Sequence, residues 1–167
     1  MIRTFIYKGK EYPEYEKSWF ASRFAFPFAL EVCQGKGYDV GCYKEEWALP
    51  GSIPIDDGPV FDAFYLPCKG NPEMDYIFSS HCLEHLPDWV RAFDYWTSCL
   101  KTGGVLFLYL PAYSQEYWRP WNNRKHIHIF SPKIIRDLMV DRGYVHIFNS
   151  GRDLYDSFMV FGEKGGK

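Results

Sequence analysis

The chain has 167 residues, of which 47% are hydrophobic and 24% charged, and its formal net charge is −2. This length corresponds to one domain, and the share of apolar residues excludes an intrinsically disordered chain. A net charge so close to zero excludes the broad positive field of a general nucleic-acid-binding protein, although it leaves room for a local basic patch.

The cysteines and the lengths of the apolar segments indicate the cellular compartment in which the protein is expected. The chain has five cysteines, an odd number, and none of them stand in a C-x-x-C spacing. This argues against a disulfide framework and against a zinc ribbon. The first residues, MIRTFIYKGKEY, lack the apolar core of a secretory signal, and no apolar run approaches the roughly 20 residues of a membrane helix. We expect a cytoplasmic protein with reduced thiols and no membrane partner.

The first 36 residues differ from the rest of the chain in their pattern of residue types. Aromatic and small side chains mix with scattered charges between Glu14 and Phe26, and Pro27 suits the first turn of a helix. We expect two short helices here, the second ending near Gly35. Residues 1–36 are therefore predicted to form a helical cap segment, and residues 37–167 the Rossmann-like body of a single domain.

From residue 37 onward, short apolar runs alternate with helical patterns. Strands are expected at 38–41, 52–56, 75–79, 104–110, 144–148 and 157–161. Helices are expected at 89–100, with Asp88 as N-cap, and between Ser131 and Gly143. Strands that alternate with helices give a parallel sheet, and the last two runs resemble an antiparallel pair. The predicted fold class is α/β: a three-layer Rossmann-like mixed sheet, mostly parallel, with a C-terminal antiparallel hairpin.

Acidic residues follow the predicted strands at suggestive positions. Asp39 lies beside Gly41 at the end of the first strand, and Asp56 and Asp57 follow the second strand. In sheets of this kind, ligands bind outside the carboxyl ends of the strands, and a carboxylate about 20 residues after a glycine turn holds a ribose diol. Asp62 follows soon after and could accept a hydrogen bond from an adenine amino group. An aspartate after a strand is also a common turn or cap residue.

The motifs resemble those of class I S-adenosylmethionine-dependent methyltransferases, in particular the methyltransferase type 11-like group. The matching segments are, in order, YDVGC, IDD, FDAFYLP, DYIFSSHCLEHLPD and LKTGGVLFLYLP, within residues 37–162. SSHCLEHLPD is the most specific of them. The resemblance implies a transferase with S-adenosyl-L-methionine as cofactor and a methyl acceptor as second substrate.

The resemblance also implies roles for individual residues. Asp39, Gly41 and Cys42 would lie under the methionine part of the cofactor. Asp56 would hold the ribose, with Asp57 as the competing candidate.

The remaining implied cofactor residues lie further along the chain. Asp62 and Ala63 would meet the adenine, and Ser79, Ser80 and His81 would line the methyl-donor site. His81 is also the first candidate for a general base, because the pKa of histidine lies near neutrality. His128 and then His126 are the next candidates.

The glycine turn departs from the pattern of the family. The usual G-x-G is replaced by Gly41-Cys42-Tyr43, so that a tyrosine stands where the second glycine lets the cofactor approach the backbone. The following crossover is short, and its helix is expected to shrink to a turn or two between Lys44 and Leu49. Either Tyr43 or Trp47 packs on the cofactor in a rebuilt pocket, or cofactor binding is weakened or lost.

A second pattern overlaps the most specific motif. Residues 81–85 spell H-x-x-E-H, which can mark a zinc hydrolase with His81 and His85 as ligands and Glu84 as base. Such a site needs a continuous helix, which Pro87 opposes, and no third ligand is evident. No metal site is therefore expected, and Glu84 and His85 are either structural or close to the substrate.

Three functions follow from these patterns. The first is a methyltransferase acting on a small-molecule or sugar/glycan acceptor, since the chain is short, nearly neutral and carries the aromatic and cationic stretch YWRPWNNRKHIH at 117–128. The second is a catalytically inactive binding module of the same fold, and the third is the zinc hydrolase. A nucleic-acid partner is not expected, and the sequence does not predict an oligomeric state.

Overall fold

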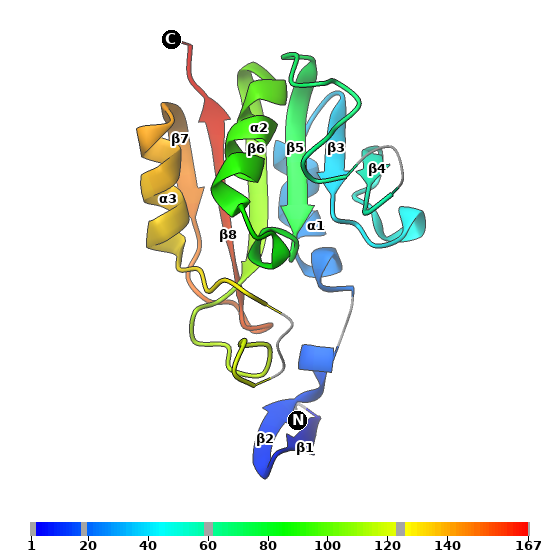
Figure 1. Cartoon of the computed structure of the whole chain (residues 1–167), viewed down its shortest axis with the longest axis vertical. Helices are drawn as coiled ribbons and strands as arrows, with labels where there is room; N and C mark the ends of the chain where they lie inside the picture. The colour runs from blue at the N-terminus through cyan, green and yellow to red at the C-terminus, as the bar shows by residue number, and fades with distance from the viewer. Residues whose placement is uncertain (1–2, 18–19, 59–61, 123–125, 167) are drawn as a thin grey trace.

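The computed structural model describes residues 3–17, 20–58, 62–122 and 126–166. Six strands form the central sheet in the order β4-β3-β5-β6-β8-β7 (Figure 1). Their bounds are β3 Gly37–Val40, β4 Ile53–Ile55, β5 Met74–Ser80, β6 Leu100–Pro111, β7 Tyr144–Asn149 and β8 Ser157–Lys164. The first four are parallel, whereas β8 runs antiparallel to β6 and β7 antiparallel to β8. The predicted mixed sheet is confirmed.

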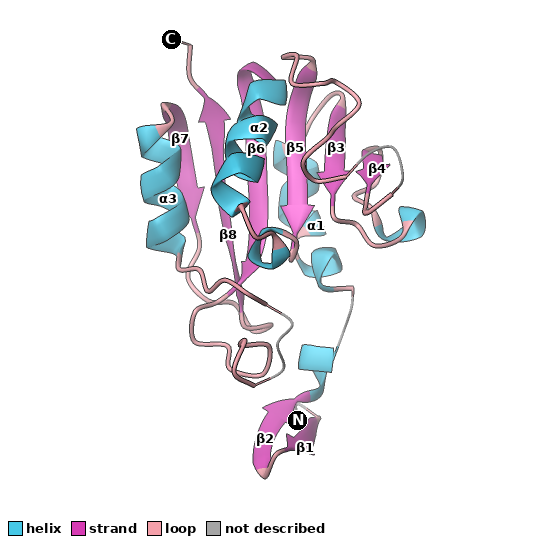
Figure 2. Cartoon of the chain, in the orientation of Figure 1, coloured by secondary structure: helices cyan, strands magenta, loops and turns pink. Residues whose placement is uncertain are grey.

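Helices cover both faces of this sheet, which gives three layers (Figure 2). Helices α2 (Trp89–Cys99) and α3 (Pro132–Asp141) lie on one face, and α1 (Phe26–Val32) lies on the other. The predicted caps form: the side chain of Asp88 accepts a hydrogen bond from the Arg91 amide, and that of Ser131 accepts one from the Ile134 amide. Among the described residues, no helix is long and apolar enough to cross a membrane.

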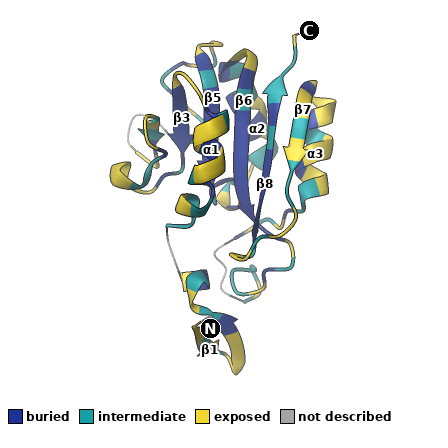
Figure 3. Cartoon of the chain, turned by 180° about the vertical axis from the view of Figure 1, so that it is seen from behind, coloured by how far each residue is buried: buried dark blue, intermediate teal, exposed yellow. Residues whose placement is uncertain are grey.

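The central strands are buried on both faces (Figure 3). Ile77 and Leu106 point toward the side of α2 and pack in one cluster with Trp96. Phe78 and Phe107, their neighbours along the strands, point the other way and pack in the cluster of α1. Burial of each such side chain contributes about 1.5–3 kcal/mol to the stability of the fold. The close-packed core therefore fixes the positions of the carboxyl ends of β3, β5 and β6.

The N-terminal segment differs from the prediction. Residues 1–36 were expected to be helical, but strands β1 (Thr4–Tyr7) and β2 (Lys10–Pro13) form an antiparallel hairpin. Its two turn residues, Lys8 and Gly9, have φ of 47° and 75°, the signature of a tight hairpin turn whose twist matches the strands. Helical structure begins only after it, with the 3-10 helices η1 (Glu14–Lys17) and η2 (Ala21–Phe24) and then α1. The division into cap and body stays a prediction.

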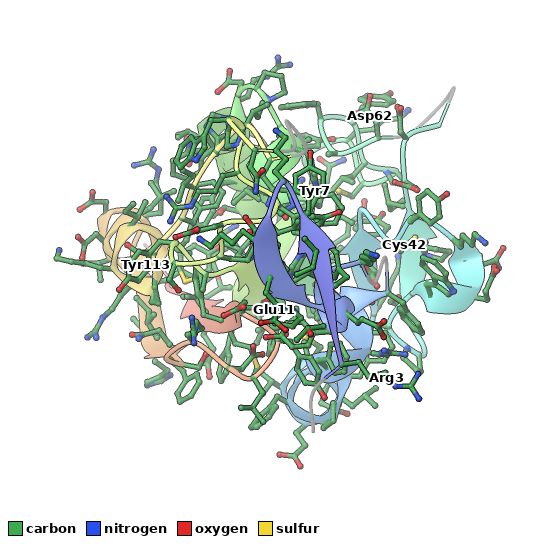
Figure 4. All side chains as sticks on the ribbon, turned by 90° about the horizontal axis from the view of Figure 1, so that it is seen from below. Arg3, Tyr7, Glu11, Cys42, Asp62 and Tyr113 are labelled. Carbon is green, nitrogen blue, oxygen red and sulfur yellow. The ribbon has the colours of Figure 1, made fainter. Side chains whose placement is uncertain are left out.

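The hairpin is held by the loop that follows β6. The Asn122 side chain donates a hydrogen bond of 3.0 Å to the Tyr12 hydroxyl, and the ring of Tyr117 packs against those of Phe5 and Tyr7. In the view from below, the hairpin carrying the labelled Tyr7 lies in front of the body (Figure 4). The N-terminal segment and the 112–122 loop therefore form one structure at this end of the sheet.

Candidate functional site

A cavity of about 460 Å³ opens where the parallel strands end. Strands β3, β4 and β5 end at Val40, Ile55 and Ser80, so the residues that follow them meet at one edge of the sheet. The volume lies in the range of small-molecule sites, roughly 300–1,000 Å³. The lining residues are Ala21, Ser22, Asp39, Gly41, Cys42, Tyr43, Asp56, Asp57, Asp62, Ala63, Phe64, Ser80, His81, Cys82, His85 and Leu86.

The turn after β3 keeps a glycine-like backbone at both critical positions. Gly41 has φ of 84°, and a Cβ there would lie 2.4 Å from the Cβ of Cys82, so no larger residue fits. Tyr43 has φ of 65° although it is not a glycine, a conformation that costs an L-residue about 1–2 kcal/mol. The residue is 59% exposed, and its ring lies 5.3 Å from that of Trp47, centroid to centroid. The tyrosine thus preserves the shape of the turn and adds an aromatic wall to the cavity.

Asp39 is a buried carboxyl group with one partner. It is 1% exposed, and its Oδ2 accepts a hydrogen bond of 2.7 Å from the Leu49 amide. Its Oδ1 has no hydrogen-bond partner within the described ranges. Burial raises the pKa of Asp39 to about 7, against the hydrogen bond from Leu49, and the Asp56 carboxylate adds to the rise. An unpaired oxygen in the lining of a cavity is suited to a cationic ligand.

The other acidic residues surround the same space. Asp56 and Asp57 are exposed at the end of β4, and Asp62 is partly buried. Asp62 Oδ1 accepts a hydrogen bond of 2.6 Å from the Phe64 amide, so this side chain shapes its own turn as well as lining the cavity. With Asp39 these make four carboxylates, and none of the described lining residues is a lysine or an arginine.

The two serines at the end of β5 point in different directions. The Ser79 hydroxyl is fully buried and donates a hydrogen bond of 2.8 Å to the Val40 carbonyl, so it links β5 to β3 and does not line the cavity. Ser80 lines the cavity, and its Oγ has no partner among the residues that the structure describes.

Histidines gather around a buried glutamate at the far wall. Glu84 is 0% exposed, and its Oε1 lies 3.8 Å from His81 Nδ1, 3.9 Å from His85 Nε2 and 3.6 Å from His126 Nε2. Burial, with a smaller contribution from His85, lowers the pKa of His81 to about 3. Burial also lowers the pKa of His126 to about 2 and raises that of Glu84 to about 8.

The chain also matches the sequence profile of a known protein family. The profile of the family described as a methyltransferase domain matches residues 21–147, more than half of the chain. The chain belongs to this family and is a class I S-adenosylmethionine-dependent methyltransferase. Its cofactor is accordingly S-adenosylmethionine. No curated protein matches this methyltransferase in sequence.

Solved structures share the fold of this methyltransferase. A chain from the complex between the Haloferax volcanii Trm112 methyltransferase activator and a methyltransferase is 14% identical, with a TM-score of 0.68 and coverage of 90% of this chain and 92% of that one. A SAM-dependent methyltransferase from Thermotoga maritima is 18% identical, with a TM-score of 0.63 and coverage of 90% and 94%. One from Archaeoglobus fulgidus is 14% identical, with a TM-score of 0.65 and coverage of 91% and 95%. Identities this low show the fold alone.

Most of the residues expected from the sequence meet in the cavity of the methyltransferase, but Ser79, His126 and His128 are not among its lining residues. Ser79 faces β3, and His128 lies outside the lining, where its Nε2 is 2.9 Å from the Leu86 carbonyl oxygen. The sequence analysis singled out neither Phe64, which lies within FDAFYLP, nor Ala21, which lies in a segment with no motif, yet both line the cavity. Nor did it place His126 beside Glu84, because more than 40 residues separate them in the chain.

The H-x-x-E-H pattern does not form the helix of a zinc peptidase. His81 has φ of 50°, outside the helical region, and only Leu83–His85 forms a single 3-10 turn, η4. The two histidines of the pattern therefore do not share one face of an α-helix. The zinc-hydrolase hypothesis loses the geometry on which it was based.

Proposed function

We propose that the methyltransferase binds S-adenosylmethionine in the cavity beyond β3, β4 and β5 and methylates a small-molecule or sugar acceptor. The unpaired Oδ1 of buried Asp39, in a cavity lined by four carboxylates, is the observation that carries the proposal. An anionic ligand would be repelled there, whereas a ligand with positive sulfonium and ammonium groups would offset the cost of burying Asp39.

The lining residues suit each part of the cofactor. Asp39 lies in β3, next to the turn that would face the methionine ammonium group. Asp56, which follows the neighbouring strand β4, would accept from the ribose hydroxyls. Ala63 and Phe64 offer an apolar surface for the adenine, and Asp62 lies next to them. Tyr43, with its ring at the edge of the cavity, replaces the open space that a second glycine would leave.

Alignment is the main catalytic contribution of these residues. When bound, S-adenosylmethionine supplies an activated methyl group, whose bond to sulfur breaks with the electron pair staying on sulfur. The chain has to hold an acceptor oxygen or nitrogen in line with that bond, which is a matter of positioning. His81 lines the cavity, but a pKa of about 3 makes its imidazole a weak base near neutral pH. His81 is therefore proposed to form part of the wall of the acceptor site, and the proton that the acceptor loses on methylation passes to water.

The acceptor is proposed to enter beneath the N-terminal segment. Ala21 and Ser22 of η2 line the cavity, and the Trp118 indole N–H donates a hydrogen bond of 2.7 Å to the Glu16 carbonyl, which ties the 112–122 loop to the same segment. We propose that a compact acceptor rather than a polymer binds beneath these elements. Exposed Trp121, with the Arg119 guanidinium 5.0 Å from its ring centroid, offers a stacking surface of the kind that suits a sugar.

Calorimetric titration with S-adenosylhomocysteine tests the proposal. The intact chain should bind it, and Asp56→Asn should weaken binding by about 10-fold or more, because a charge-assisted hydrogen bond is lost. Asp57→Asn is the matched control, since it removes the same charge one residue further along and should have a smaller effect. Absence of binding up to millimolar ligand, or equal affinities for Asp56→Asn and the unmodified chain, would contradict the proposed site.

A binding module without transfer activity is the second candidate, and Tyr43 is the observation that favours it. A side chain at the second glycine position limits how closely a ligand can approach the backbone. Incubation with radiolabelled S-adenosylmethionine and pools of hydroxyl and amine acceptors separates the two candidates. Label transferred to an acceptor excludes the inactive module, and cofactor binding without transfer to any pool supports it.

A further inference from the structure

The carboxyl group of Glu84 is ionisable and buried, and it has no hydrogen-bond partner among the described residues. It is 0% exposed, and neither Oε1 nor Oε2 has a partner in the described part of the chain. A buried polar group left unpaired is destabilising, and more so if it is charged. Its main chain is well satisfied, because the Glu84 carbonyl accepts hydrogen bonds from the amides of Ile127 and His128. The backbone of Glu84 is thus fixed by hydrogen bonds, whereas its carboxyl group has none in the described part of the chain.

Imidazole nitrogens surround that carboxyl group. One nitrogen each of His81 and His126 and one oxygen of Glu84 all lie within 4.8 Å of one another. The separations from Oε1, 3.8 Å to His81 and 3.6 Å to His126, exceed the length of a hydrogen bond. A shared proton alone therefore does not join these groups at their present spacing.

The Ser157 hydroxyl lies on the far side of His81, 2.9 Å from its Nε2. When this hydroxyl donates to the Tyr155 carbonyl, 3.3 Å away, it can accept a hydrogen bond from His81 Nε2. In that tautomer Nδ1, which faces Glu84, carries the lone pair. An imidazole that donates one N–H to a neighbour and turns its other nitrogen toward a carboxylate has the arrangement of a metal ligand with its supporting hydrogen bond.

We propose that His81, Glu84 and His126 bind a divalent transition-metal ion of the Zn²⁺ class. Two imidazoles and one carboxylate are the ligands of known zinc sites. Bonds of about 2.0–2.1 Å in tetrahedral geometry place ligand atoms about 3.3–3.4 Å apart. The distances from Glu84 Oε1 to the two imidazoles, 3.8 and 3.6 Å, need to close by a few tenths of an ångström, whereas the three atoms as a set lie within 4.8 Å and need a side-chain rotation of His81 or His126 to close. His85 Nε2, 3.9 Å from the same Glu84 oxygen, can supply a fourth ligand.

The ion would sit in the wall of the cavity. His81 and His85 line the cavity, whereas Glu84 and His126 lie behind them. An acceptor with a hydroxyl or carboxylate oxygen could reach the ion from the cavity, and this consequence for the substrate rests on the proposed function. The metal site itself rests only on the side chains described above.

Co²⁺ followed by Zn²⁺ is the probe for this site, with the full chain first stripped by a chelator. We expect one Co²⁺ per chain, with visible d–d absorption, without near-ultraviolet thiolate bands, and displaced by Zn²⁺. Glu84→Gln and His126→Ala should each lower the affinity for Co²⁺ by about 100-fold, and Ser157→Ala by about 10-fold through its effect on His81. His146→Ala, at an exposed histidine of β7 paired with Glu163, is the matched control and should not change it.

Several results would overturn the metal site. They are the absence of stoichiometric binding, thiolate bands from Cys42 or Cys82, and full affinity in either Glu84→Gln or His126→Ala. If Glu84→Gln does not fold, as judged by circular dichroism, His126→Ala and Ser157→Ala decide the question. Because no cofactor is present in these titrations, their failure is distinct from a failure of S-adenosylhomocysteine binding.

Discussion

The site has an acidic half and a histidine half, which differ in how far their ionisable groups are buried. The acidic half (Asp39, Asp56, Asp57 and Asp62) lies around an open cavity, and only Asp39 is buried. The histidine half (His81, Glu84, His85 and His126) is built around a carboxyl group with no exposure at all. An open ring of carboxylates suits a large cationic ligand, whereas imidazole nitrogens gathered around one buried carboxyl group suit a small ion. The two halves should therefore respond to different ligands and to different substitutions.

Gly41→Ala should have the largest effect, because it strikes the junction of the two halves. The new Cβ would lie 2.4 Å from the Cβ of Cys82, the residue after His81, at φ of 84°. We expect a loss of about 3 kcal/mol in the free energy of unfolding, measured with urea. Gly51→Ala is the control, since φ is 87° but nothing lies within 4 Å of its Cβ. Equal losses in the two variants would show that the contact with Cys82 does not matter.

Asp39→Asn should act on the acidic half alone and in a pH-dependent way. Burial raises the pKa of Asp39 to about 7 in the folded chain, above its ordinary value of 3.8. The folded state therefore keeps a proton that the unfolded state releases, and stability falls as pH rises from about 4 to 7. The asparagine variant lacks this loss and should be more stable by about 2 kcal/mol above pH 7, with little difference near pH 4. Parallel stability curves for the two proteins would contradict this role of Asp39.

Trp96→Phe should show how the core supports the acidic half. The Trp96 indole N–H donates a hydrogen bond of 2.7 Å to the carbonyl of Ala63, which lines the cavity. We expect a loss of about 1–2 kcal/mol in stability and weaker binding of S-adenosylhomocysteine by calorimetry. In Tyr95→Phe the lost hydroxyl contacts Leu66, outside the lining. Tyr95→Phe should lose stability but keep its affinity for S-adenosylhomocysteine. If the affinity falls equally in Trp96→Phe and Tyr95→Phe, the hydrogen bond to Ala63 has no specific role in binding.

Tyr43→Gly should have the smallest effect on stability. It relieves a left-handed conformation that costs about 1–2 kcal/mol but adds about 0.5–1 kcal/mol of backbone entropy to the unfolded chain. We expect a gain of about 0.5 kcal/mol or less and tighter binding of S-adenosylhomocysteine, since the backbone becomes accessible. Weaker binding in this variant would indicate instead that the tyrosine ring packs on the cofactor.

The sheet and the acidic half could be predicted because their signals are local. Asp39, Asp56 and Asp62 each stand close behind a strand or a motif in the sequence, and parallel strands bring such positions to one edge. The short first crossover also follows the prediction, as the single 3-10 helix η3 (Glu45–Trp47).

The rest depended on contacts that no local pattern carries. The N-terminal hairpin was missed because its aromatic residues pack against Tyr117, far along the chain. His128 was ranked above His126, but of these two only the His126 side chain reaches the Glu84 carboxyl group. A spacing of two residues gave no reason to prefer it. Ser79 and Ser80 are adjacent, and only the register of β5 against β3 decides which of them lines the cavity.

A crystal structure of the chain with S-adenosylhomocysteine tests the central claim most directly. We expect the adenosyl group in the cavity beyond β3 and β4, with the ribose hydroxyls on Asp56 and the ammonium group on Asp39 Oδ1. A ligand bound elsewhere, or one that leaves both of these carboxylates without contact, would contradict the assignment of the acidic half as the cofactor site.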